Sequence, residues 1–158
     1  MPLEQPASSG VAIGAGEMAA RLFVALLCGA LVGIERQWQH KHAGVRTHAL
    51  VSIGASSFGL ISLLGFGATN NPMLIAGGVV TGIGFIGGGV IMRQGGTIQG
   101  SNTAATLWAT ASMGLAAGAG YYVLTGLVFI CVLVIQFPLR WLEESIEARG
   151  GGPGGPSG

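Results

Sequence analysis

The 158-residue chain is half hydrophobic, only 8% of its residues are charged, and its net charge is +1. A soluble domain carries about 25% charged residues, so this chain has too few polar side chains to cover a water-exposed globule, and its surface is expected to face lipid. The seven basic residues are scattered along the chain, which argues against nucleic-acid binding.

Five apolar stretches follow one another when Gly, Ser and Thr are allowed inside a stretch: residues 18–34, 49–66, 73–92, 103–119 and 122–139. Each has about 17 to 20 residues, the length that a helix needs to cross a bilayer. The thirty glycines favour close helix packing. The sequence therefore predicts an all-α polytopic membrane protein of about five tightly packed transmembrane helices. Three or four spans stay open on hydropathy alone, because the second and fourth stretches are the least apolar.

The basic residues predict the orientation of these spans. With five crossings, six of the seven Lys and Arg side chains fall on one side of the bilayer: Arg36, Lys41, Arg46, Arg93, Arg140 and Arg149. By the positive-inside rule that side is cytoplasmic, so the N-terminus is expected outside and the C-terminus inside the cell. The first stretch is followed rather than preceded by positive charge, the reverse of a secretory signal, and is expected to remain as a span.

Four segments are predicted along the chain. Residues 1–16 form a polar lead, residues 17–140 the transmembrane domain, residues 141–149 a short cytoplasmic amphipathic segment, and residues 150–158 a flexible Gly/Pro tail or a vector-derived addition.

Charged residues at the ends of the first two spans are expected to find partners, because they are partly desolvated there. We expect Glu35 to pair with Arg46, with a functional polar site at the cytoplasmic mouth as the alternative. Topology alone accounts for Arg36 and Lys41. Glu17 and Arg21 are spaced i, i+4 at the outer start of the first span and are expected to pair as well.

Two blocks carry a family resemblance. The stretches "GIERQWQHKHAGVRTHALVSIGA" (33–55) and "GIGFIGGGVIMRQGGTIQGSNTAATLWATASMGLAAGAG" (82–120) resemble the two signature blocks of the MgtC/SapB family of bacterial inner-membrane proteins. The resemblance implies a virulence-associated protein that supports growth at low Mg²⁺ and survival inside macrophages. The family was first linked to Mg²⁺ transport, and some members resemble regulators that bind other membrane proteins, including the F-type ATP synthase. The sequence departs from the family pattern at Ser101, where Leu is common, and no soluble C-terminal domain like that of many members is expected.

Glycines spaced by four residues predict flat strips for helix packing. The stretch "GIGFIG" (82–87) also matches a dinucleotide-binding fingerprint, but it lies inside an apolar 20-mer and lacks the acidic residue that the fingerprint requires. The run Gly87-Gly88-Gly89 has a second interpretation, a kinked or broken helix whose carbonyls surround an ion. The predicted packing residues are Gly29, Gly33, Gly78, Gly82, Gly84, Gly88, Gly114 and Gly118.

Polar residues recur at helical spacing in the second and fourth stretches. Their hydroxyls can bond back to carbonyls of their own helix, or both stripes can face the interior and line a hydrated cavity or ion site. Ser101 or Asn102 is also a natural N-cap of the fourth helix. The residues predicted to line such a cavity are Glu35, Arg46, Thr47, His48, Ser52, Ser56, Asn102, Thr103, Thr106 and Thr110.

Enzyme and metal chemistry are not expected. The hydroxyl side chains have no Asp partner, so no catalytic residue is predicted. The three histidines fit no standard Zn²⁺ spacing, and the support for Mg²⁺ is weak because Glu35 is nearly alone as a carboxylate beside the spans. No cofactor is therefore expected. Two functions stay open: a non-enzymatic regulator that contacts itself as a homodimer or another membrane protein, and a small transporter or channel for Mg²⁺ or another solute.

Overall fold

The computed structural model describes residues 13–65, 71–94, 97–137 and 145. Its elements are α1 (Ala15–Trp38), α2 (Val45–Leu64), α3 (Pro72–Val90), β1 (Met92–Gln94), β2 (Thr97–Gln99), α4 (Ser101–Gly118) and α5 (Tyr122–Gln136). The all-α class is confirmed, and each helix covers most of one predicted apolar stretch. Most of the predicted lead and, apart from Ser145, the predicted segments 141–149 and 150–158 lie outside the described residues.

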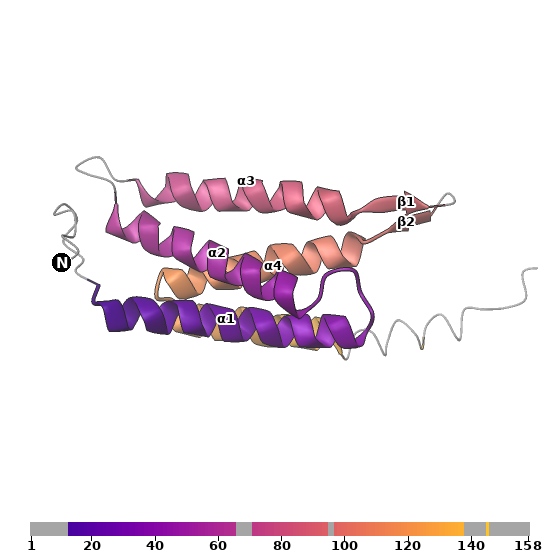
Figure 1. The fold of residues 1–158 in the computed structure, drawn as a ribbon, viewed down its shortest axis with the longest axis horizontal. Coiled ribbons are helices and arrows are strands. Elements are labelled where there is room, and N and C mark those ends of the chain that lie inside the picture. Colours follow the sequence, from indigo (N-terminus) through magenta and orange to yellow (C-terminus); the bar gives the residue numbers. More distant parts are fainter. Residues whose placement is uncertain (1–12, 66–70, 95–96, 138–144, 146–158) are drawn as a thin grey trace, which may run out of the picture.

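Three of the described helices, α1, α2 and α3, are long and apolar enough to cross a membrane, and α5 is apolar but shorter. The fourth helix is different because it lies inside the bundle. It contacts α1, α2, α3 and α5, and α2 and α4 lie between α1 and α3 (Figure 1). The lower hydropathy of α4 follows from this position, since its polar side chains meet neighbouring helices instead of lipid.

A short antiparallel hairpin between α3 and α4 was not predicted. In β1 and β2, Met92 pairs with Gln99 and Arg93 with Ile98. The sequence did hold a signal for it, because Gly-Gly at positions 95 and 96 is a common hairpin dipeptide between two strands. Three-residue strands are too short to show an alternating pattern, so hydrophobic periodicity does not reveal this hairpin.

The helices alternate in direction, so the α1–α2 connection and the hairpin lie at the same end of the bundle (Figure 1). We call this the basic end, because Arg36, Lys41, Arg46 and Arg93 belong to its segments. The gathering of basic residues at one end is the arrangement that the positive-inside rule requires of a membrane bundle.

Glycines bring both α1 and α4 into backbone contact with α2. A Cβ atom on Gly29 would lie 2.6 Å from the Cβ of Ser52, and one on Gly33 would lie 2.9 Å from the carbonyl oxygen of Gly44. On α4, Gly114 and Gly118 sit directly against the backbone oxygens of Ser52 and Ser56, where a Cβ would collide. Backbone contact of this kind is the main attraction between helices in lipid.

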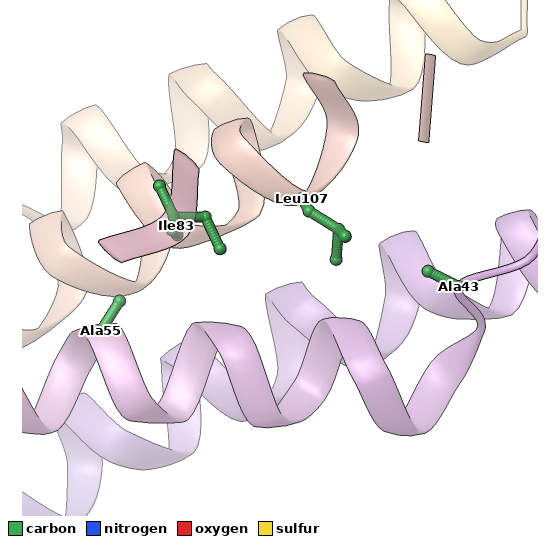
Figure 2. Packing of buried hydrophobic residues seen from close by; sticks show 5 residues of the cluster. Ala43, Ala55, Ile83 and Leu107 are labelled. Atoms are coloured by element: carbon green, nitrogen blue, oxygen red, sulfur yellow. The ribbon is translucent and has the colours of Figure 1, made fainter. Parts of the chain in front are cut away.

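Small and branched side chains fill the space around these contacts. Leu107 of α4, Ile83 of α3, Ala55 of α2 and Ala43 of the α1–α2 connection belong to one buried cluster (Figure 2). Three helices thus meet through short side chains, which keeps their axes close.

The predicted glycine strip of α3 does not pack against any other element that the structure describes. A Cβ on Gly78, Gly82, Gly84 or Gly88 would meet no atom of a neighbouring element within 4 Å. The helix rests on its neighbours through Ile83 and Gly87 instead, which are its buried residues. The helix also continues through Gly87-Gly88-Gly89 to Val90, so the alternative of a broken helix at this run is wrong.

Candidate functional site

A buried arginine forms the centre of the polar site at the basic end. Arg36, in the last turn of α1, is 1% exposed. Its Nη1 donates to Oε1 of Gln136 at 2.8 Å, and its Nη2 donates to Oγ1 of Thr103 at 3.1 Å. One guanidinium therefore connects α1 to α4 and α5.

The hydrogen bonds continue from Gln136 along α4. Nε2 of Gln136 donates to Oγ1 of Thr106 at 2.8 Å, and the Thr106 hydroxyl donates to the carbonyl oxygen of Asn102 at 2.8 Å. We call Arg36, Gln136, Thr103, Thr106 and Asn102 the Arg36 network. Buried polar groups are tolerated when they are hydrogen-bonded, and this network gives the side chains of Arg36, Gln136, Thr103 and Thr106 partners across three helices.

Glu35 does not form the predicted ion pair with Arg46. The carboxylate of Glu35 is buried, at 4% exposure, and accepts a hydrogen bond from Nε2 of Gln39. Arg46 is exposed on the first turn of α2, and the structure shows no ion pair between it and Glu35. Helix α1 extends to Trp38, four residues beyond the predicted span, so Glu35 lies within a helix and faces the bundle.

The polar residues of α2 form a buried line, which we call the α2 polar line: His48, Ser52 and Ser56. All three are fully buried. The Nδ1 atom of His48 lies 3.0 Å from the carbonyl oxygen of Gly44. Its Nε2 atom and the two serine hydroxyls have no hydrogen-bond partner in the described part of the chain. The glycines packed against this line leave no space for a wide pore.

The threonines of α4 behave differently from these serines. Thr110 donates to the carbonyl oxygen of Thr106 at 2.8 Å, and Thr106 donates to that of Asn102. Bonding back to the same helix therefore accounts for two of the three stripe residues, whereas Thr103 accepts from Arg36.

The residues predicted to line a cavity differ in how deeply they are buried. Thr47 is half-buried, and Arg46 and Asn102 are exposed. The buried members are Glu35, His48, Ser52, Ser56, Thr103, Thr106 and Thr110. Both stripes thus face the interior.

A polar cavity of about 330 Å³ lies beside the Arg36 network, and of the predicted set only Asn102 and Thr103 line it. We call it the basic cavity, because four of its side chains are basic or imidazole groups from the end of α1 and the α1–α2 connection. Its full lining is Arg36, His40, Lys41, His42, Gln99, Gly100, Ser101, Asn102 and Thr103.

Gly100 shapes one wall of this cavity. It has a φ of 91° and serves as the N-cap of α4, so the predicted cap at Ser101 or Asn102 is wrong. A side chain at position 100 would collide with the carbonyl oxygen of Val90. The chain turns sharply from the hairpin into α4 here, in a left-handed conformation that only Gly adopts easily.

The predicted set left out several site residues. They are Arg36 and Gln136 of the Arg36 network and His40, Lys41, His42, Gln99, Gly100 and Ser101 of the basic cavity. Arg36 and Lys41 had been assigned to topology alone. A signal existed for Gln136, since it is the one strongly polar side chain inside the stretch 122–139, and a polar residue at that depth usually faces the bundle interior.

At the opposite end, the predicted pairing of Glu17 with Arg21 is confirmed by an N–O distance of 2.9 Å. Nη1 of Arg21 also donates to the carbonyl oxygen of Gly118 at 2.9 Å, and the Tyr122 hydroxyl donates to Oε1 of Glu17 at 2.8 Å. These bonds join α1 to the end of α4 and the start of α5.

Gly120→Ala should weaken this end of the bundle. Gly120 has a φ of 84°, and a Cβ there would lie 2.9 Å from the guanidinium of Arg21. The backbone strain alone costs about 1 to 2 kcal/mol, and this loss should appear in the free energy of unfolding from an SDS titration in mixed micelles. Gly126→Ala, in open space on α5, is the control and should not destabilise. Equal stability of the two variants would contradict the close contact with Arg21.

In the described part of the chain, no three His, Cys, Asp or Glu residues lie close enough together to hold a metal ion. The polar groups of the site are suited to hydrogen bonding and to holding negative charge.

Comparisons with known proteins agree on one family. A model of the MgtC family matches residues 22–145. An uncharacterized protein of Synechocystis sp. is 44% identical over 127 residues, which make up 80% of this chain and 54% of that protein. Protein MgtC of Salmonella typhimurium is 44% identical over 126 residues, and Protein MgtC of Brucella abortus is 40% identical over 129 residues. These matches cover 80% and 82% of this chain and 54% of each relative, so the chain spans about half the length of the curated relatives it matches. No solved structure matches the chain.

Proposed function

Because this chain belongs to the MgtC family, we propose that it is a non-enzymatic regulator of the bacterial inner membrane. It supports adaptation to low magnesium and survival inside host cells, and it acts by binding other membrane proteins. Five spans cross the bilayer, with the N-terminus outside and the basic end in the cytoplasm. The three long apolar helices and the basic residues at one end of the bundle support this topology.

The observation that carries the proposal is the open face of α3. Between α2 and α3 lies a groove of about 620 Å³, which we call the α2–α3 groove. Gly78 and Gly82 of α3 line it without a neighbouring atom within 4 Å of their Cβ positions. In lipid, a strip of small residues beside apolar side chains favours contact with another helix. The side chains around the strip come from Leu50, Val51, Phe58, Ile75, Val79, Ile83 and Ile86.

The occupant we propose is a transmembrane helix of a partner protein. The family resemblance makes the F-type ATP synthase one candidate, and a second copy of this chain is another. Both would use the same contact, in which a partner helix lies along Gly78 and Gly82.

Photo-crosslinking in bacteria tests this contact. A benzoyl-phenylalanine placed at Ile86, in the groove, should give a discrete adduct, whereas one at Leu31, on the exposed side of α1, should not. Gly82→Leu fills the groove and should abolish both the adduct and growth at low magnesium in a strain that lacks its own MgtC-family gene. Gly84→Leu is the matched control, because it adds the same bulk to α3 outside the groove lining.

The size of the adduct distinguishes a second copy of the chain from another protein. An adduct that forms equally at Leu31, or that persists in Gly82→Leu, would contradict the proposal.

A second candidate, a small transporter, is favoured by the α2 polar line, since three buried polar groups there have no partner among the described residues. The tight glycine contacts beside the line oppose it. The purified chain in liposomes should therefore show no Mg²⁺ or monovalent-cation flux. Robust flux that is abolished by Thr106→Val or Glu35→Gln would replace the regulator with a transporter.

A further inference from the structure

We propose that the basic cavity binds a phosphate group, carried either by an anionic phospholipid or by a free phosphate compound. The charge of its lining is the first observation. Arg36 and Lys41 are cations, His40 and His42 contribute imidazole groups, and no carboxylate is found among the described residues that line it. Glu35 is directed to Gln39 instead. A cavity lined in this way attracts an anion and repels Mg²⁺.

The second observation is the fixed position of Arg36. Its hydrogen bonds to Gln136 and Thr103 hold the guanidinium at the cavity wall, where it is shielded from solvent. A planar, pre-oriented guanidinium binds phosphate oxygens with little further loss of side-chain entropy. Lys41 is exposed at the rim, so its ammonium group can move to meet a bound anion.

The end of β2 and the start of α4 supply neutral donors to the cavity. Ser101, Asn102 and Gln99 line it with hydroxyl and amide groups, and the first turn of α4 has no side-chain cap among the described residues. Backbone N–H groups at such a turn add to the attraction of the cations. The volume of about 330 Å³ equals the share of roughly ten water molecules in liquid water, enough for a phosphate group with part of its hydration.

The location of the cavity is consistent with both sources of phosphate. It lies at the basic end, beside a hairpin that exposes Met92 and Ile98. Basic pockets at the cytoplasmic ends of membrane helices bind anionic headgroups, and the same end is open to soluble phosphates of the cytoplasm.

Calorimetric titration of the purified, delipidated full chain in a nonionic detergent tests the proposal. Inorganic phosphate is used in one arm and dihexanoyl phosphatidylglycerol in the other. Lys41→Gln removes a cation at the cavity rim, and Arg46→Gln is the matched control, because it removes an exposed cation from the same end without touching the cavity. Neither position is in the Arg36 network, so both variants should fold.

We expect the dissociation constant for the ligand to rise about three- to five-fold in Lys41→Gln and less than about two-fold in Arg46→Gln. Binding of inorganic phosphate identifies a free phosphate site. Binding of phosphatidylglycerol without competition from inorganic phosphate identifies a lipid site. The proposal is overturned if neither ligand binds, or if both substitutions weaken binding equally, since surface charge alone would then explain the affinity. Because the groove and the cavity are separate, Gly82→Leu should leave this binding unchanged, so failure here is distinguishable from failure of the proposed function.

Discussion

Gly114→Ala is expected to lower the free energy of unfolding by about 2 to 3 kcal/mol, the upper part of the range for overpacked cores. Gly114 lies directly against the backbone oxygen of Ser52, so the added methyl group meets main chain that no rotamer change can move away. Helices α2 and α4 must separate to accept it. That separation would also loosen the contact between Ser52 and Gly29, because α1 and α4 both pack against Ser52 of α2.

The measurement is an SDS titration of the purified protein in mixed micelles, followed by circular dichroism. Gly82→Ala is the matched control, because its Cβ would stand in open space on α3. The control should gain up to about 1 kcal/mol from higher helix propensity. If Gly114→Ala is as stable as this control, the close approach of α2 and α4 is wrong.

Arg36→Ala is expected to cost about 2 to 4 kcal/mol, because it leaves the buried Gln136 and Thr103 without the donor that they share. Arg46→Ala removes the same charge from an exposed site and should change the stability by less than about 0.5 kcal/mol. Arg36→Lys should fall between the two, since an ammonium group cannot reproduce the planar fork.

The same titration measures these three variants. A stability loss for Arg46→Ala that equals the loss for Arg36→Ala would show that charge, and not the buried network, holds this end together. The pair therefore tests directly which arginine of the basic end supports the fold.

The two arginines of α1 occupy equivalent positions at opposite ends of the bundle. Arg21 donates to Gly118 at the end of α4, and Arg36 donates to Thr103 at its start. Fifteen residues of helix separate them, about 22 Å, which lies within the thickness of a hydrocarbon core of about 30 Å. In an environment that gives helices no hydrophobic reason to associate, charged hydrogen bonds at both ends fix how far α1 and α4 can slide past each other.

Apolar length and composition were enough to predict the five helices, because a helix in lipid must satisfy its own backbone and so needs only a long enough apolar run. Local spacing was also enough for Glu17 and Arg21, which are neighbours on any helix. Close packing at Gly29 and Gly114 could be predicted because the sequence shows directly that these positions have no side chain. The structure places both glycines against α2. The residues of the two signature blocks were enough to identify the family.

Only the tertiary structure decided which faces meet. Helix α3 is richer in glycine than α4, yet Gly82 faces open space while Gly114 touches α2. The sequence predicted an ion pair for Arg46 and only a topological role for Arg36. A four-residue extension of α1 instead placed Arg36 and Glu35 inside the bundle, while Arg46 stayed outside. Composition and periodicity describe one helix at a time, whereas burial and hydrogen bonding depend on which neighbour lies opposite each face.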